Sequence, residues 1–141
     1  MIDEMGIFRT TIELSPWPDH DKRLVLRDVI VDTGSEYTWI PRAQLEALGV
    51  TATRSERFKT ADGRVLERDI GFAVVFAGGR AAPTIVVFAE MDDMVLLGAI
   101  ALEGLNLRID IISRAGPGGT RPGRLRERGP TTASLRAIVR H

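Results

Sequence analysis

The feature that most constrains this chain is an apolar segment that runs directly into a cluster of small polar residues. Residues 29–35 read Val-Ile-Val-Asp-Thr-Gly-Ser. Three β-branched residues in a row are typical of a strand buried on both faces, and the residues after them favour turns. The pattern predicts that Asp32 stands at the end of a rigid strand and that Gly34 lets the backbone turn where a Cβ atom would clash. Thr33 and Ser35 supply hydroxyls that can hold the loop and its carboxylate.

The rest of the first 113 residues reads as short strands separated by turn residues. Strands are expected over residues 7–14, 24–31, 37–40, 56–60, 64–70, 71–77, 83–89, 95–97 and 105–112. Two short helices are expected over residues 41–48 and 99–103, ended by Gly49 and Gly104. Many short strands with glycine turns predict a mostly β fold, either a barrel or a sandwich.

The sequence Asp-Thr-Gly-Ser at 32–35 resembles the catalytic loop of the aspartic proteases. Trp39-Ile40-Pro41 stands at the spacing at which pepsin-like members carry tryptophan, an aliphatic residue and proline. Glu36 matches the acid that follows the loop in single-domain retroviral and bacterial members. The chain is therefore similar to the retropepsin-like aspartic proteases, and the resemblance spans residues 5–113.

A second motif supports the same resemblance. Residues 95–98 form an apolar run that ends in Leu97 and Gly98, with a predicted helix after it. In the retropepsin family such a strand end lies beneath the catalytic loop and completes a psi-shaped core. The tight turn expected between the two motifs stands where the family keeps its substrate-covering flap. The residues of that turn are Ala61, Asp62 and Gly63. The resemblance implies a small closed acid-protease-type β-barrel with a psi-loop core, a flap hairpin and two short helices.

The activity that the resemblance implies needs two carboxylates. Like charges at such close range cannot both ionise, so one aspartate takes a proton from water while the other, protonated, polarises the scissile carbonyl. The chain carries the motif once, because Asp92-Asp93 lacks the Thr-Gly and reads as a solvated loop. The second carboxylate is therefore expected from Asp32 of another copy, in a homodimer that cleaves a peptide or protein substrate. Thr33 is expected to bond across the two-fold axis.

Composition excludes several other classes of site. The chain has no cysteine, which rules out disulfides, thiolate zinc sites and a cysteine nucleophile. The two histidines stand alone, so no metal and no cofactor is expected. A net charge of zero gives no nucleic-acid signature. The acidic start lacks the pattern of a signal peptide and the apolar runs are too short to cross a bilayer, so we expect a cytoplasmic protein without a membrane partner.

The last 28 residues differ from the rest in charge and in turn content. Residues 114–141 hold seven arginines and one acid, together with several glycines and prolines. Such a segment has too few apolar residues to build a core of its own. We expect a protease domain over residues 1–113 and a disordered basic tail over residues 114–141.

Two other functions fit parts of the sequence. A catalytically silent dimer could keep the fold as a peptide-binding groove, although such a module has no chemical need for Asp32. An anionic-ligand binder driven by the tail would lose affinity steeply with salt.

Overall fold

Strands make up most of the structure, a computed structural model that describes residues 8–18, 21–110 and 124–127. The strands are β1 (Arg9–Pro16), β2 (Leu24–Val31), β3 (Thr38–Pro41), β4 (Ala52–Lys59), β5 (Val65–Ala77), β6 (Arg80–Ala89), β7 (Leu96–Leu97), β8 (Leu107–Asp110) and β9 (Arg124–Glu127). The two short helices are α1 (Arg42–Leu48) and α2 (Ala99–Leu105). The predicted strands over 64–70 and 71–77 form one long strand, β5.

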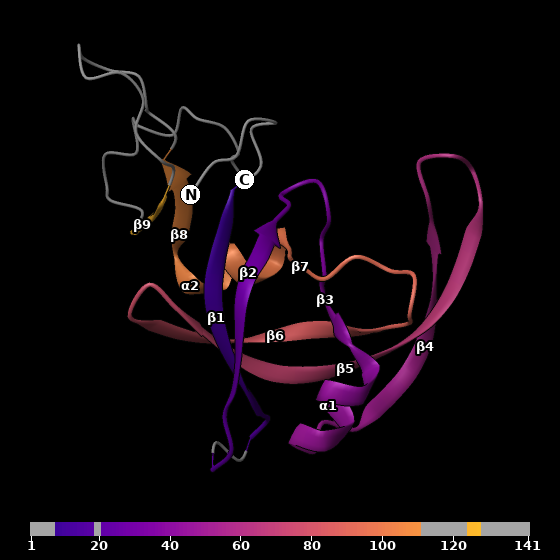
Figure 1. Ribbon diagram of the computed structural model, residues 1–141, viewed down its shortest axis with the longest axis horizontal. Coiled ribbons are helices and arrows are strands. Elements are labelled where there is room, and N and C mark those ends of the chain that lie inside the picture. The colour runs from indigo at the N-terminus through magenta and orange to yellow at the C-terminus, as the bar shows by residue number, and fades with distance from the viewer. Residues whose placement is uncertain (1–7, 19–20, 111–123, 128–141) are drawn as a thin grey trace.

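Six strands close into a ring. The large sheet runs in the order β1-β2-β7-β3-β6-β5-β4, and an additional pairing of β1 with β5 joins its two sides. Of the seven strands in this sheet, β4 stays outside the ring, as an edge strand that pairs with β5 and projects with it away from the barrel (Figure 1). The fold is therefore the predicted one: mostly β, a small closed barrel of the acid-protease type with a flap hairpin and two short helices.

The centre of the barrel is the predicted psi-loop. Strand β7 runs parallel to β2, with Ile30 opposite Leu96 and Val31 opposite Leu97. On its other side β7 meets β3 in the antiparallel sense, where Leu96 stands opposite Trp39. Strands β2 and β3 are consecutive in the chain, so β7 fills the space between them. The loop that joins β2 to β3 therefore sits directly over the end of β7.

A β-bulge aims the end of β2 into the core. Opposite the two-residue step from Thr10 to Ile12, β2 advances three residues, from Leu26 to Val29. The extra residue is accommodated at Asp28, which has a left-handed φ of 56°. Two successive exposed residues, 27 and 28, break the alternation, and Val29 returns to the buried side.

The helices close the barrel with apolar faces. Helix α1 buries Leu45 and Leu48, and α2 buries Leu102 and Leu105 among its core residues. These side chains join one hydrophobic cluster with residues of the barrel strands, including Phe88. Helix α1 ends at a left-handed Gly49, as predicted.

The predicted end of the second helix is wrong. Helix α2 continues through Gly104 to Leu105, and the left-handed residue that ends it is Asn106, with a φ of 59°. Gly104 serves a different purpose, because a Cβ atom there would lie 3.1 Å from the Cβ of Ala82 on β6. The glycine allows the helix to approach the sheet closely, and the last strand of the body begins two residues later than expected, at Leu107.

Part of the basic tail pairs with the body. Strand β9 lies antiparallel to β8, with Leu107 opposite Glu127 and Asp110 opposite Arg124. The sequence analysis expected no strand beyond residue 113, so it missed β9. The rest of the tail and both histidines lie outside the described residues, and the domain boundary near residue 113 stays a prediction.

Candidate active site

Asp32 stands at the end of β2, where hydrogen bonds fix both its backbone and its side chain. Its N–H donates to the carbonyl of Leu97 (2.9 Å), and its own carbonyl accepts from the N–H of Ser35 (3.1 Å). The N–H of Gly34 donates to the Asp32 carboxylate at Oδ1 (2.9 Å). A Cβ atom at Gly34 would lie 3.2 Å from the same oxygen, so glycine leaves room for this contact. The half-buried carboxylate is thus held in one orientation at the end of a rigid strand.

The loop that follows Asp32 is bonded to the start of helix α2. The first N–H groups of a helix have no partner inside the helix. Here the N–H of Ala99 donates to the carbonyl of Ser35 (2.8 Å), and that of Ile100 donates to the carbonyl of Glu36 (3.1 Å). The Ser35 hydroxyl also donates to the carbonyl of Tyr37 (3.0 Å). The loop and the helix therefore satisfy each other's polar groups.

Leu97 and Gly98 lie beneath the loop. Leu97 is fully buried. A Cβ atom at Gly98 would stand 2.3 Å from the carbonyl oxygen of Tyr37 and 2.8 Å from that of Ser35, so no other residue fits. The N–H of Gly98 donates to Thr38 Oγ1 (3.0 Å), a hydroxyl on a completely buried side chain. Sequence reasoning missed Thr38, because a threonine at the start of a strand is ordinary and nothing local marks it.

Thr33 lies between Asp32 and Gly34, and its side chain has no hydrogen-bond partner among the residues that the structure describes. The residue is half-buried. A hydroxyl in that setting is available to a group from outside.

The turn at 61–63 connects β4 to β5 at the tip of the projecting hairpin. The N–H of Gly63 donates to the carbonyl of Thr60 (2.9 Å), and Gly63 has a φ of 89°. The Asp62 carboxylate accepts from the Thr60 hydroxyl and pairs with Arg64, and the first of these bonds is the main reason that the pKa of Asp62 is lowered. Ala61 is exposed beside it. The tip is therefore an ordered polar turn.

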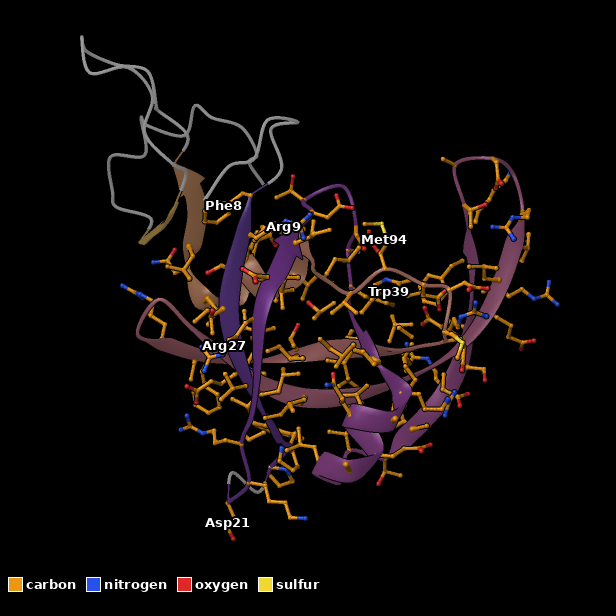
Figure 2. All side chains as sticks on the ribbon, in the orientation of Figure 1. Phe8, Arg9, Asp21, Arg27, Trp39 and Met94 are labelled. Atoms are coloured by element: carbon orange, nitrogen blue, oxygen red, sulfur yellow. The ribbon has the colours of Figure 1, made fainter. Side chains whose placement is uncertain are left out.

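An aromatic cluster joins the hairpin to the strand after the loop. Phe58 of β4 meets Trp39 edge-on with ring centroids 5.0 Å apart, and it meets Tyr37 in the same manner at 5.8 Å. Trp39 lies on the side of β3 that faces the hairpin (Figure 2). Burial raises the pKa of Tyr37, and the nearby Glu56 carboxylate adds to the rise. Sequence reasoning did not single out Phe58, whose partners Tyr37 and Trp39 lie far from it in the chain.

Of the two neighbouring aspartates before β7, Asp92 and Asp93, one is exposed to solvent and the other is not. Asp92 is exposed, as expected. The Asp93 carboxylate, in contrast, is 8% exposed and forms an ion pair with Arg68 of β5 at 2.7 Å. The interpretation of both residues as a solvated loop is therefore wrong for Asp93. Among the described residues, no group of three His, Cys, Asp or Glu side chains could hold a metal ion, and no helix is long and apolar enough to cross a membrane.

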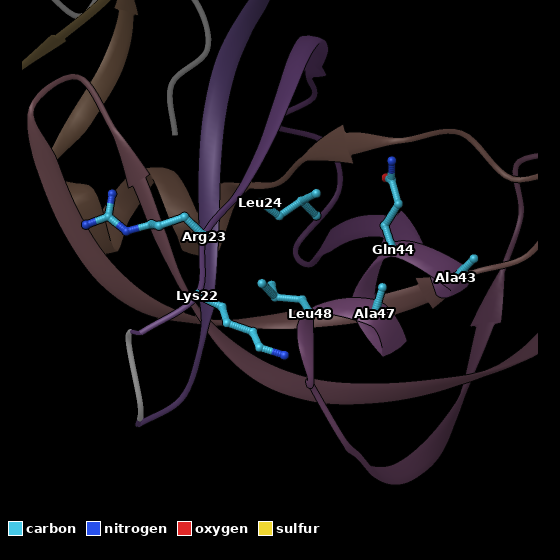
Figure 3. Close-up of a pocket in the computed structure, with 7 residues that line it drawn as sticks. All are labelled: Lys22, Arg23, Leu24, Ala43, Gln44, Ala47 and Leu48. Carbon is cyan, nitrogen blue, oxygen red and sulfur yellow. The ribbon is translucent and has the colours of Figure 1, made fainter.

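A separate cavity of about 430 Å³ lies between helix α1 and the start of β2 (Figure 3). Its walls are formed by Lys22, Arg23, Leu24, Ala43, Gln44, Ala47 and Leu48. None of the residues predicted for the active site lines it, so the cavity is distinct from the Asp32 loop.

Comparison with known proteins agrees with this geometry. A family model described as "Aspartyl protease" matches residues 22–100, more than half of the chain and a span that includes both the Asp32 loop and Gly98. The chain belongs to the aspartyl protease family. Its single Asp-Thr-Gly loop and closed barrel are those of a retropepsin-like aspartic protease.

The chain also resembles the solution structure of the Simian Foamy Virus (mac) protease, with 20% identity and a TM-score of 0.46. That match covers 67% of this aspartyl protease and 91% of the viral chain. No curated protein matches the sequence.

Proposed function

We propose that this aspartyl protease is an endopeptidase that hydrolyses peptide bonds with water activated by two Asp32 carboxylates, one from each protomer of a homodimer. The observation that carries the proposal is the fixed orientation of Asp32, whose Oδ1 accepts the Gly34 N–H at 2.9 Å at the end of β2. Preorganised carboxylates of this kind suit general acid–base catalysis, because little rearrangement is needed during the reaction.

The two carboxylates have different roles in the reaction. The ionised one removes a proton from a water molecule as that water attacks the scissile carbonyl carbon. The protonated one donates its hydrogen bond to the carbonyl oxygen, where negative charge develops. Two carboxylates this close cannot both carry a charge, so the pair holds one shared proton. Activity is therefore expected at acid to mildly acid pH.

A second copy of the chain is required by the count of available carboxylates. Each chain offers one Asp-Thr-Gly loop, and Asp93, the other buried aspartate near β7, is already paired with Arg68. The Thr33 hydroxyl, which has no hydrogen-bond partner among the described residues, supports an axis at the loop, since a two-fold axis there would give it a partner from the second protomer.

The hairpin of β4 and β5 is proposed as the flap that covers the substrate. It carries Phe58 on its inner side, packed toward Tyr37 and Trp39, and its tip residues Ala61, Asp62 and Gly63 project beyond the barrel (Figure 1). An extended peptide or protein segment is the substrate that a groove between such a hairpin and the loop would accept. The role of the tip, like the cytoplasmic location, stays a prediction.

The test compares Asp32→Asn with Asp92→Asn, a change of the same type in an exposed loop residue. Denatured casein and a mixed-sequence peptide library serve as probes. We expect wild type and the Asp92 variant to cleave them, the Asp32 variant to lose cleavage while it keeps its fold, a statine-type inhibitor to block activity and a chelator to leave it unchanged. Equal cleavage by the Asp32 variant would show that the assignment is wrong. Peptide binding without cleavage by the wild type would favour the silent peptide-binding module instead.

A further inference from the structure

Two adjacent residues of β5, Arg68 and Asp69, attach this strand to other elements near the base of the flap hairpin. One of them acts on each face of the strand. Successive side chains of a strand point to opposite faces. The neighbours Arg68 and Asp69 accordingly reach in opposite directions, and each of them meets a charged partner on a different element. These two contacts define where the hairpin is attached.

On one face, Arg68 forms a two-pronged ion pair with Asp93. Its Nε lies 2.7 Å from Oδ2 and its Nη2 lies 3.0 Å from Oδ1. The side chains are 17% and 8% exposed, so water screens the pair weakly. Asp93 Oδ2 also accepts the N–H of Glu90 (2.8 Å), and the Asp93 N–H donates to the carbonyl of Glu90 (3.0 Å). Arg68 therefore binds β5 to a closed turn at the start of the segment 90–95.

On the other face, Asp69 joins β5 to helix α1. Its Oδ2 lies 2.9 Å from Nη2 of Arg42, and its Oδ1 accepts the hydroxyl of Ser55 on β4 (2.8 Å). Arg42 also binds Glu90 at 2.9 Å and stacks over the ring of Phe88. One guanidinium thus connects the hairpin, the helix and the same turn that Arg68 reaches.

From residue 67 toward its tip, the hairpin makes few contacts with the rest of the described structure. Among the described strands, β4 pairs with β5 alone. Residues 57–67 form no ion pair or hydrogen bond with a described residue outside the hairpin of residues 52–77, and their polar contacts, such as Asp62 with Arg64, lie inside it. Within this part, Phe58 packs against Trp39 and Tyr37 of the barrel.

We propose that Arg68 and Asp69 are positioning residues that form the fulcrum of the flap, which is the fixed base about which the hairpin opens. Opening is then confined to residues 57–67. Segment 90–95 leads directly into β7, and β7 carries the Leu97 carbonyl that binds the N–H of Asp32. The same clamp therefore sets the position of the flap relative to the catalytic loop. The consequence for catalysis rests on the proposed peptidase function, whereas the fulcrum itself does not.

The first measurement is amide hydrogen exchange of the full chain without substrate. Arg68→Gln removes the two-pronged pair, and Arg68→Lys keeps the charge but loses the fork geometry. We expect amides of residues 57–67 to exchange about tenfold faster in Arg68→Gln, the effect of losing a charged hydrogen bond, and to a smaller extent in Arg68→Lys. The fast region should also spread past residue 68. Glu13→Gln, which breaks the exposed Arg23–Glu13 pair on the barrel, is the matched control and should change nothing in the hairpin. Unchanged exchange at 57–67 in both Arg68 variants would overturn the fulcrum.

The second measurement separates binding from chemistry. A flap that is loosened at its base must be ordered by the substrate, so KM should rise severalfold in Arg68→Lys while kcat changes little. A fall in kcat at constant KM would mean that the pair acts on the Asp32 loop and not on the flap, which would overturn the proposal. If the wild type cleaves no peptide, the proposed function fails, and the exchange result still decides the fulcrum on its own.

Discussion

The α-carbon of Gly98 faces the carbonyl oxygen of Tyr37 so closely that a Cβ atom would stand 2.3 Å from it. This contact fixes the height of the catalytic loop above β7, because the Tyr37 carbonyl also accepts the Ser35 hydroxyl. Any side chain at position 98 must push the loop away from the strand beneath it.

Gly98→Ala is therefore expected to destabilise the protein by about 1–3 kcal/mol, the range for overpacking a well-packed site. It should also abolish activity, since the displaced loop carries Asp32. Urea unfolding and cleavage of casein measure the two effects. Gly104→Ala is the matched control in the same helix region. Its Cβ atom would meet only the Ala82 Cβ at 3.1 Å at close range, and alanine favours the helix. A Gly98 variant as stable and active as the Gly104 variant would show that the close contact of Gly98 with the Tyr37 carbonyl does not require glycine.

The buried hydroxyl of Thr38 gives a second prediction. Thr38→Val keeps the shape of the side chain but leaves the Gly98 N–H without its acceptor. An unsatisfied buried donor costs about 1–3 kcal/mol, so the free energy of unfolding should fall by that amount. Thr38→Ser retains the hydroxyl and should lose clearly less. Urea titration of the three proteins provides the comparison, and equal losses for valine and serine would show that the hydroxyl is unimportant.

The elements that could be predicted from the sequence are those whose backbone geometry demands particular residues. Asp32 follows the apolar run of residues 29–31, and its turn favours Gly34 because a Cβ atom there would lie 3.2 Å from the carboxylate oxygen. Gly98 is required by contact with the loop. The constraint at Gly34 acts within the loop itself, so the motif exposes it directly. The place of Gly98 and the psi-loop came from the resemblance of the two motifs to the retropepsin family.

The features that were missed depend on partners far away in the chain. Arg68 meets Asp93 only because the barrel places β5 beside the segment before β7, so nothing near Asp93 marks it as buried. Gly104 has the local pattern of a helix end, but its role is close approach to Ala82. Strand β9 has few apolar residues and exists through its pairing with β8, which local composition cannot reveal.

The dimer prediction concerns Thr33. If its hydroxyl bonds across the two-fold axis, Thr33→Ala should weaken association by roughly 1–2 kcal/mol, the cost of one lost hydrogen bond. Thr33→Ser keeps the hydroxyl and serves as the control. Sedimentation over a range of protein concentrations reports the dissociation constant, and activity should follow the dimer fraction. A strictly monomeric wild type that still cleaves peptides through Asp32 would contradict the two-copy mechanism.

Removal of residues 114–141 tests the proposed boundary near residue 113. The deletion takes away β9, whose described contact with the body is the four-residue pairing with β8. An isolated two-stranded pairing is marginally stable, so the melting temperature should change little. A large drop in calorimetry would place the tail within the folded domain.

The ion pair of Arg68 and Asp93 predicts how stability responds to acid. The hydrogen bond from Arg68 is the main reason that the pKa of Asp93 lies below its usual value. A carboxylate with a lowered pKa in the folded state contributes its full stabilisation above the unfolded-state pKa of about 4. That contribution disappears as the pH falls through the lowered value. The Asp69 carboxylate, whose pKa is lowered chiefly by Arg42, should behave in the same way.

Asp93→Asn should accordingly be less stable than wild type by about 1–3 kcal/mol at pH 7, where the charged hydrogen bonds to Arg68 are lost. At pH 2 the difference should shrink, because wild-type Asp93 then approaches the neutral state as well. Urea unfolding at pH 7, 4 and 2 gives the free energies. Glu13→Gln, at an ion pair whose side chains are 48% and 39% exposed, should show a small difference at every pH. A stability gap between Asp93→Asn and wild type that stays constant from pH 7 to pH 2 would show that it comes from packing at position 93 and not from the charge.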